Sequence, residues 1–300
     1  MFYVALFAIG VCFGSFLNVV SLRHKPGKKT FLLSEISGRS YCPKCKRTLQ
    51  WYELLPLISF LFLRGRCKTC KKRISFQYPM IELLSGLVFL FVPLFFARFF
   101  NIGDLFLFRS ELWGFYAFVL IWIVVFWFLL LMSVIDIRKY IIPNGINLIL
   151  FVLGIFALLL KIFSGEWLLL FRQSFVGSYA VLFTPFQNIF LNHLLGFFAG
   201  GLFFWVVYVV TRGRGMGFGD VKLGFALGIL LAWPDILFAI IFAFIVGGAW
   251  GIIALFLRKK GMKSKLPFGP FFAIGTVMVV FLGIRFWSGI LGCLVSRAYF

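Results

Sequence analysis

The chain has 300 residues, of which 62% are hydrophobic and 44 are phenylalanine, and its mean hydropathy is +1.04. A soluble domain cannot bury so much apolar surface, so the composition excludes a soluble globular protein and indicates a polytopic membrane protein. The net charge of +21 does not indicate binding to nucleic acid, because the basic residues flank apolar segments; contact with membrane lipids that carry anionic headgroups explains them.

Eight apolar runs predict transmembrane helices in an all-α fold, since each approaches the length that crosses about 30 Å of hydrocarbon. They lie at about 2–22, 79–98, 115–135, 145–163, 189–211, 221–233, 236–257 and 270–292. The sixth run is short, so seven helices is the alternative count. The stretch 167–188 is also apolar, but its polar residues and Pro185 predict an interfacial segment.

Most of the 30 Lys and Arg residues lie in four loops that eight helices would place on one side of the membrane. These loops are 23–77, 136–144, 212–222 and 258–265. Positive loops face the cytoplasm, so we expect the N terminus outside and these loops inside. Seven helices would put 258–265 on the opposite face, which favours eight. Residues 1–22 have their basic cluster after the apolar run and predict a retained anchor.

The expected organisation is a first helix at 1–22, a cytoplasmic domain at 23–77 and a helical membrane domain at 78–293. The cytoplasmic domain contains two C-x-x-C motifs, formed by Cys42, Cys45, Cys67 and Cys70. Two such knuckles at this separation are typical of a tetrahedral zinc site. Disulfides are the alternative, which a reducing cytoplasmic location disfavours.

Four protein ligands leave no open position for water, so the predicted zinc is structural and staples a segment too small to fold alone. The same segment contains an apolar run at 51–66 that is too short to span a membrane. We expect this run to pack against the membrane surface or against the helical bundle.

Small and polar residues recur on one face of the first predicted helix, at Gly10, Gly14, Asn18 and Ser21. Such a stripe lets two helix backbones approach closely. The glycines at 196, 200 and 201, and those at 247, 248 and 251, predict helix contacts for the same reason.

Only nine residues are acidic, and most of them fall in predicted loops. We expect four of them to be solvated charges in loops or turns on the outer side: Asp104, Glu111, Glu166 and Asp235. Glu35 and Glu53 could balance the basic residues of the cytoplasmic segment. Glu82, Asp136 and Asp220 remain at membrane depth or its edge, where a carboxylate is costly and usually marks function.

Asp136 and Asp220 both fall at the cytoplasmic end of a predicted helix, and nothing in their positions prevents them from meeting in one cleft. Two carboxylates in a shared, partly dry site cannot both ionise easily, so one keeps a proton. The ionised group can then activate water while the protonated group hydrogen-bonds a carbonyl. Alternatively, Asp136 forms an ion pair with Arg138, Lys139 or Lys222, or the two aspartates form a proton relay.

Three glycines surround Asp220 in "GMGFGDVKLG" (215–224). Gly217 and Gly219 carry no Cβ, which would let a substrate backbone approach the carboxylate. Together with Lys222 they are the candidate substrate-binding residues. The alternative is that these glycines only cap and pack helices.

The chain resembles the type IV prepilin peptidases, which are also called prepilin leader peptidase/N-methyltransferases. These enzymes are aspartic proteases with a G-x-G-D motif. The resemblance rests on the order and spacing of motifs along most of the chain. They are "GSFLNVVSLR" (14–23), "CPKCKRTLQWYELLPLISFLFLRGRCKTC" (42–70), "ISFQYPMIELLSG" (74–86), "SVIDIRKYIIPN" (133–144), "GMGFGDVKLG" (215–224) and "PFGPFFAIG" (267–275).

The resemblance implies that Asp136 and Asp220 are the catalytic pair and that the cysteine segment is a zinc-bearing cytoplasmic domain. It implies cleavage of the basic leader of prepilin or pseudopilin precursors, after a glycine, at the cytoplasmic face of the bacterial inner membrane. It also implies methyl transfer from S-adenosylmethionine to the new terminal amine. The chain departs from the family at Asn144, where "IPD" is common; the missing carboxylate is not one of the pair, so we expect proteolysis to persist.

Candidate methyl-donor residues are Gly65 and Arg66, for the donor's carboxylate, and Glu53 and Glu82, for its amine. Each has a structural alternative: headgroup contact for the arginine, and zinc-domain or helix packing for the glutamates. No G-x-G-type cofactor loop of the soluble kind is recognisable in the sequence.

Two rival functions use the same residues differently. A proton-coupled membrane transporter would use Asp136 and Asp220 as relay groups, although no internal repeat of the kind found in many transporters is visible. A zinc-stapled membrane scaffold would explain the four cysteines but not the aspartate among glycines.

Overall fold

The computed structural model describes residues 2–24, 38–99, 113–163, 175, 188–257 and 266–298, with side chains as far as 283. Within these residues the fold is helical and contains no strand; two isolated bridges join Tyr41 to Thr48 and Arg66 to Arg73. Several sequence predictions lie outside the described residues: those for Glu35, Asp104, Glu111, Glu166, the loop 258–265 and the interfacial stretch apart from Phe175 and Asn188.

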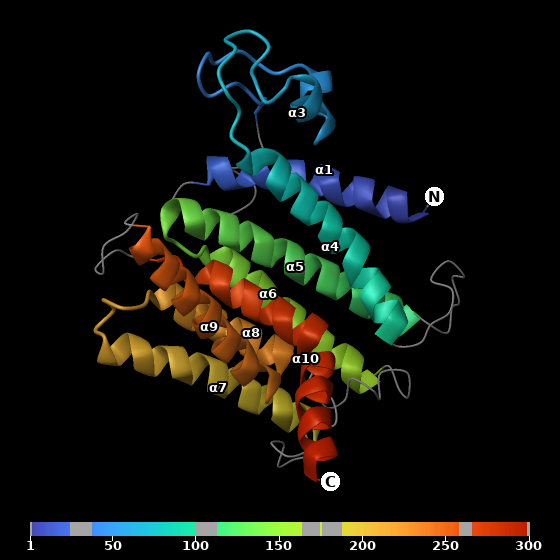
Figure 1. Cartoon of the computed structure of the whole chain (residues 1–300), viewed down its shortest axis with the longest axis vertical. Helices are drawn as coiled ribbons and strands as arrows, with labels where there is room; N and C mark the ends of the chain where they lie inside the picture. Colours follow the sequence, from blue (N-terminus) through green and yellow to red (C-terminus); the bar gives the residue numbers. More distant parts are fainter. Residues whose placement is uncertain are drawn as a thin grey trace. The chain divides into compact units, whose positions relative to one another are not determined.

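Every apolar run predicted to be a helix is one (Figure 1). The long helices are α1 (Phe2–Arg23), α4 (Gln77–Phe99), α5 (Trp113–Lys139), α6 (Asn144–Phe163), α7 (Ile189–Val210), α8 (Phe218–Leu231), α9 (Asp235–Phe256) and α10 (Gly269–Ala298). Two short elements, η1 (Trp51–Leu54) and α3 (Ile58–Phe62), lie in the cysteine segment.

Six of these helices are long and apolar enough to cross a membrane, counting only the residues that the structure describes: α1, α4, α5, α6, α7 and α9. Helix α8 has 14 residues and is too short by this measure, and α10 contributes a shorter apolar stretch at Gly269–Gly283. The all-α polytopic fold is therefore confirmed, and the count of eight spans holds approximately.

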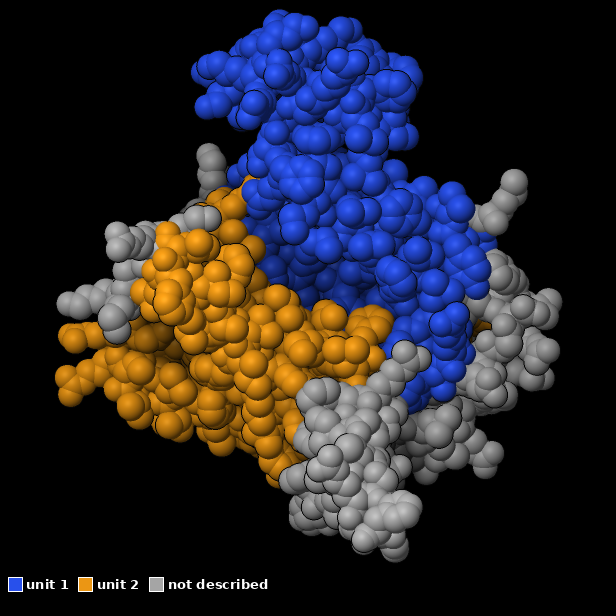
Figure 2. All heavy atoms as spheres, viewed as in Figure 1, with its two compact units in different colours: residues 1–105, 122–135 blue, residues 106–121, 136–300 orange. Residues whose placement is uncertain are grey.

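The chain divides into two compact units (Figure 2). Unit 1 comprises residues 1–105 and 122–135, and so joins α1, the cysteine segment, α4 and part of α5. Unit 2 comprises residues 106–121 and 136–300, which include α6 to α10.

In unit 1, α1 packs directly against α4 through the predicted stripe of small residues. A Cβ on Gly10 would lie 2.8 Å from the Ser85 carbonyl oxygen, and one on Gly14 would lie 2.7 Å from Glu82 Cα. Ser85 Oγ donates to the Gly10 carbonyl at 2.6 Å, and Asn18 Nδ2 donates to the Tyr78 carbonyl at 3.2 Å. The predicted close packing of the first helix is confirmed.

In unit 2, glycines also let α7 and α8 touch backbone to backbone. A Cβ on Gly196 would lie 2.6 Å from the Gly228 carbonyl oxygen, and one on Gly200 would lie 2.5 Å from that of Gly224. A Cβ on Gly201 would overlap the Phe225 ring. This contact positions α8, whose first turn contains Asp220.

We predict that Gly228→Ala destabilises the protein by about 1–3 kcal/mol, because the added methyl group overlaps the Gly196 carbonyl oxygen and backbone has to move. Gly248→Ala in α9 is the matched control, since a Cβ there meets no atom of the described residues within 4 Å, and the helix contact predicted for this glycine is not found among them. Thermal unfolding of both variants in detergent checks this prediction. Equal midpoints for the two variants would contradict the close α7–α8 contact.

Polar side chains are buried among α6, α7 and α9. Lys161 Nζ lies 3.4 Å from His193 Nε2, and His193 Nδ1 lies 2.6 Å from the Ile229 carbonyl oxygen. Asp235 is 1% exposed and accepts a hydrogen bond from the Phe175 N–H at 2.8 Å. The prediction of a solvated charge at Asp235 was therefore wrong, because the carboxylate is enclosed and bonds to backbone that the sequence places 60 residues away.

Candidate active site

Asp136 lies in the last turns of α5 and is 4% exposed. Its Oδ2 accepts a hydrogen bond of 2.9 Å from the N–H of Gly269, the first residue of α10. The segment that leads into α10 therefore holds one oxygen of this carboxylate and leaves the other for a further partner.

Asp220 lies in the first turn of α8 and is 8% exposed. Its Oδ2 accepts a hydrogen bond of 3.1 Å from the N–H of Gly217, the residue before the helix. The N-terminal end of a helix dipole favours a negative charge at such a position. Asp220 is thus held in the same manner as Asp136, by the N–H of a glycine at a helix start.

The two carboxylates are near enough to interact electrostatically, and both belong to unit 2. Both are also withdrawn from solvent, so the charge on one opposes ionisation of the other. In a coupled pair of this kind one carboxyl ionises before the other, which lets the ionised member act as a base and the protonated member as a hydrogen-bond donor. The structure brings these two residues together as the sequence allowed.

The residues around Asp220 explain part of the glycine pattern. Gly219 packs against Ile142, where a Cβ would lie 3.2 Å from the Ile142 Cβ, and its carbonyl accepts a bond of 3.3 Å from Asn147 Nδ2. Among the residues that the structure describes, a Cβ on Gly217 would meet only Asp220 Oδ2, at 3.5 Å, and the Gly219 nitrogen. Gly219 therefore has a packing role, whereas the space beside Gly217 is open.

Lys222 donates to Asn144 Oδ1 at 2.9 Å, and its ammonium lies over the Phe218 ring. Asn144 begins α6, so this bond joins the first turns of α6 and α8. Lys222 was one of the ion-pair candidates for Asp136, and in the structure it donates to the neutral side-chain amide of Asn144, the residue at which the chain departs from the "IPD" motif.

We predict different consequences for two glycine substitutions. Gly219→Ala should lower stability by about 1–2 kcal/mol, because its methyl group presses on Ile142. Gly217→Ala should leave stability within about 0.5 kcal/mol but reduce turnover, because the methyl group enters the open space beside Asp220. Unfolding and turnover measured on each variant check the prediction, and unchanged activity of Gly217→Ala would remove its substrate role.

The four cysteines of unit 1 converge on one point. The Sγ atoms of Cys42, Cys45, Cys67 and Cys70 all lie within 4.8 Å of one another, and none of the four is in a disulfide. Thiolates bound to one zinc ion at about 2.3 Å would be separated by about 3.8 Å in a tetrahedron. The cluster can therefore hold a metal ion, and the disulfide alternative does not apply.

The two knuckles have the same backbone geometry. Cys42 N–H donates to the Arg47 carbonyl, and Cys67 N–H donates to the Lys72 carbonyl, both at 2.9 Å. The residue after each second cysteine has a positive φ of 57°. The repeat of one turn in two places brings two thiols to each side of a single site.

Electrostatics favours a cation in this cluster. The N–H groups of Cys70 and Thr69 point at the Cys67 sulfur and lower its pKa to about 6. The Arg47 N–H lowers the pKa of Cys45, but burial and the other cysteine side chains raise it, so that the net value is about 11. Four thiolates so close together repel one another, and a divalent cation among them removes that penalty.

The candidate methyl-donor residues all have structural contacts in unit 1. Glu53 is buried, pairs with Arg47 at 2.6 Å and accepts the Gln50 N–H at 2.9 Å. Burial raises the pKa of Glu53, but these two bonds outweigh burial and hold it below its usual range. Glu82 is also buried and accepts the Leu57 N–H at 2.8 Å.

Gly65 and Arg66 follow α3. Gly65 has a φ of +65°, which a residue with a side chain rarely adopts, and its N–H donates to the Phe60 carbonyl at 2.9 Å. Arg66 is exposed and bridges Arg73 through its backbone. The backbone of Arg66 thus belongs to a turn held by hydrogen bonds, while its side chain is exposed.

Sequence reasoning missed two partners of the aspartate site, Gly269 and Asn147. Gly269 lies in "PFGPFFAIG", one of the motifs that carry the family resemblance, and a bond from a backbone N–H leaves no side-chain pattern in the sequence. Asn147 follows Asn144 by three residues on α6, so an asparagine at that spacing was the available clue.

These features define a multi-pass membrane protein with a buried carboxylate pair and a four-cysteine cluster, which is the construction of a membrane aspartic peptidase. Residues 8–96 match the family model of the bacterial peptidase A24 N-terminal domain, and residues 123–252 match that of the type IV leader peptidase family. No solved structure matches the chain.

Curated relatives agree with these models. The chain is 32% identical to the prepilin leader peptidase/N-methyltransferase of Bacillus subtilis (strain 168), over 93% of each chain. It is 31% identical to the protein of the same name in Burkholderia pseudomallei (strain 1026b), over 93% of this chain and 85% of the relative. The chain therefore belongs to the type IV leader peptidase family, as the motifs predicted.

Proposed function

We propose that this protein cleaves the basic leader from prepilin or pseudopilin precursors, after a glycine, and then methylates the new N-terminal amine. The proposal is supported above all by the paired, buried carboxylates of Asp136 and Asp220, each held through one oxygen by a glycine N–H. Membership of the family, and the names of its relatives as prepilin leader peptidase/N-methyltransferases, supply the substrate class.

In the proposed cleavage, the two aspartates bind one water molecule. The ionised carboxylate takes a proton from this water as its oxygen attacks the carbonyl carbon of the scissile peptide bond. The protonated carboxyl hydrogen-bonds the carbonyl oxygen as negative charge develops there. When the C–N bond breaks, a proton passes from the aspartate pair to the leaving amine.

Gly217, Gly219 and Lys222 form the proposed approach to this pair. The open space beside Gly217 would admit an extended peptide backbone next to Asp220. Lys222 is tied to Asn144, so it would face the substrate from a fixed position, and Gly219 would set the distance between α8 and Ile142.

We place the protein in the bacterial inner membrane with the N terminus outside and the aspartates at the cytoplasmic face. The distribution of Lys and Arg among the loops supports this orientation. A basic leader that stays in the cytoplasm would reach the site without crossing the membrane, and anionic lipids would contact the same loops.

For the second reaction we propose S-adenosylmethionine as the methyl donor. Arg66 would pair with the carboxylate of this donor. Gly65, which has no side chain, would let the donor come close to the backbone beside Arg66. Glu53 and Glu82, whose carboxylates already accept backbone hydrogen bonds, would position this segment rather than move protons. The metal in the cysteine cluster is proposed to be structural zinc, because the four thiols leave no free coordination position.

The test is a reaction of purified protein in detergent with a prepilin-like precursor, with and without S-adenosylmethionine. Mass spectrometry should show a leader ending in glycine in both reactions, and one added methyl group on the mature product only when the donor is present. A precursor left intact by folded protein would contradict the proposal, and proton flux in proteoliposomes would then favour the transporter alternative.

A further inference from the structure

The short elements η1 and α3 expose a row of large apolar side chains. The row contains Trp51, Leu55, Ile58, Leu61 and Phe62, and Leu61 and Phe62 are 73% and 85% exposed. Their spacing places Ile58, Leu61 and Phe62 on one face of a helix. A contiguous apolar surface of this kind marks a contact with another apolar phase or partner.

This row is fixed to a membrane-spanning helix at some depth. The Leu57 N–H donates to Glu82 Oε2 at 2.8 Å, and the Ser15 side chain lies near the same carboxylate. Glu82 lies five residues into α4, and Ser15 lies eight residues before the end of α1, which correspond to about 8 Å and about 12 Å of helix. Leu57 is therefore held well below the ends of both helices.

Leu57 adopts a positive φ of 57°, which is costly for a leucine. The bond to Glu82 holds the chain in this conformation immediately before α3 begins at Ile58. Glu82 thus sets both the depth and the direction in which α3 leaves the turn.

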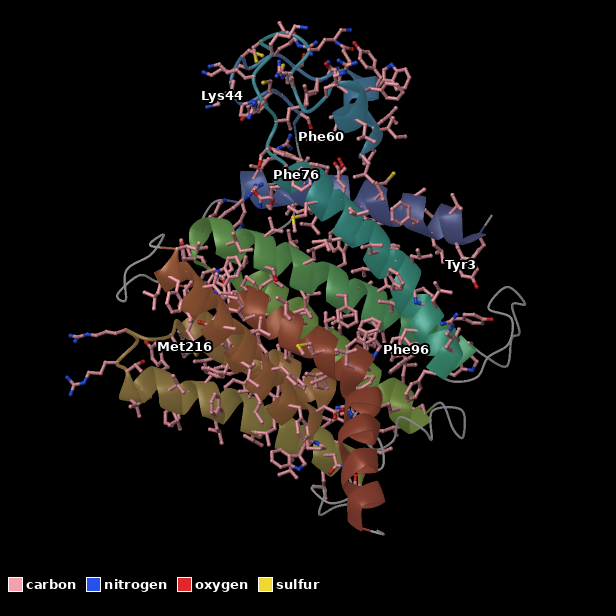
Figure 3. All side chains as sticks on the ribbon, in the orientation of Figure 1. Tyr3, Lys44, Phe60, Phe76, Phe96 and Met216 are labelled. Carbon is pink, nitrogen blue, oxygen red and sulfur yellow. The ribbon has the colours of Figure 1, made fainter. Side chains whose placement is uncertain are left out.

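The exposed row continues onto the outer side of α4. The Phe60 and Phe76 rings pack edge to face with centroids 6.4 Å apart, and Figure 3 shows Phe60 in the cysteine segment and Phe76 at the start of α4. Phe76 is exposed, as is Met80 one turn further into α4. A side of a spanning helix that exposes apolar residues faces lipid, so the row borders a lipid-facing surface.

Charge around the row also matches a membrane surface. The six basic residues that follow α3 are all exposed: Arg64, Arg66, Lys68, Lys71, Lys72 and Arg73. Apolar and aromatic side chains that enter the headgroup–acyl boundary by about 5–10 Å, next to lysines and arginines, are typical of interfacial helices. Anionic headgroups would pair with these cations.

We infer that α3 is an interfacial anchor, which embeds Ile58, Leu61 and Phe62 in the lipid leaflet beside α4 and so attaches the cysteine segment to the membrane surface. The molecule that covers this exposed row is phospholipid, with acyl chains against the apolar side chains and anionic headgroups against the basic residues. The inference requires only that α1 and α4 span a membrane, so it stands independently of the proposed peptidase function.

The experiment places the photo-cross-linking residue p-benzoylphenylalanine at position 62 of the full chain, in nanodiscs of phosphatidylethanolamine and phosphatidylglycerol. The control replaces Lys44, an exposed residue of the first knuckle that lies away from α3 (Figure 3). After irradiation, mass spectrometry should find phospholipid adducts at position 62 and none at position 44. Unchanged metal content of both variants shows that the segment is folded.

Glu82→Ala in the position-62 variant tests the anchor itself. Loss of the Glu82 bond to Leu57 should reduce the yield of phospholipid adducts several-fold while the four cysteines still bind metal. Adducts at position 62 with a second copy of the chain, with an added prepilin-like precursor or only within the same chain would each overturn the inference.

Discussion

Asp136→Asn and Asp220→Asn are each expected to lower kcat for leader cleavage by about 10²–10⁴-fold, the usual contribution of a positioned acid or base. An amide can still accept the hydrogen bonds from Gly269 and Gly217, so the fold should persist. It cannot take a proton from water, and therefore the chemical step is lost. Cleavage assays of purified variants, with their unfolding temperatures, measure the two effects separately.

Asp235→Asn is the matched control for this experiment. Asp235 is a third buried aspartate of unit 2, and its carboxylate accepts the Phe175 N–H. An amide oxygen can accept the same bond, so the variant should keep its cleavage activity. If Asp136→Asn or Asp220→Asn cleaved precursor at the normal rate, the two-aspartate mechanism would be wrong.

The second large effect is expected in the cysteine cluster. The double variant Cys42→Ser/Cys67→Ser should lose the metal, which we expect to be about one zinc ion per chain in the unmodified protein. Structural zinc contributes about 10–16 kcal/mol to the folding of small domains, so its loss should unfold the cysteine segment. Metal analysis measures the loss of the metal, and limited proteolysis of the segment around residues 38–76 measures its unfolding.

Cys12→Ser is the control, because Cys12 is a free cysteine of α1 outside the cluster. It should retain the full metal content and the protease resistance of the unmodified protein. Full metal content in the double variant would contradict the assignment of the cluster as the metal site. Methylation should fall with the metal, since Arg66 and Gly65 lie directly before Cys67.

Asp136 and Asp220 are held in the same way, because each accepts a hydrogen bond from a glycine N–H. In each case one carboxylate oxygen is fixed by backbone at the start of a helix, α10 for Asp136 and α8 for Asp220. Backbone donors do not titrate, so they orient both carboxylates whichever one carries the proton. The bond between Lys222 and Asn144 joins α8 to α6 beside this pair, and it does not require a carboxylate at position 144.

The sequence alone determined the features that depend on local pattern. Hydrophobic runs located every long helix, because a segment that crosses lipid must be apolar along its whole length. Cysteine spacing located the four-cysteine cluster that can hold a metal ion, because each C-x-x-C motif brings two thiols together within one turn. The order of the motifs identified the family and, with it, predicted the role of the two aspartates.

Only the tertiary structure decided the contacts between distant segments. The Gly269 N–H reaches Asp136 across 133 residues of chain, and Asp235 is buried against Phe175, a contact that no periodicity near either residue could predict. Gly219 proved to pack on Ile142, and Glu82 to hold Leu57. Hydropathy and residue spacing indicate whether one segment is buried and which local structure it forms. Which distant residue it contacts depends on how the helices pack.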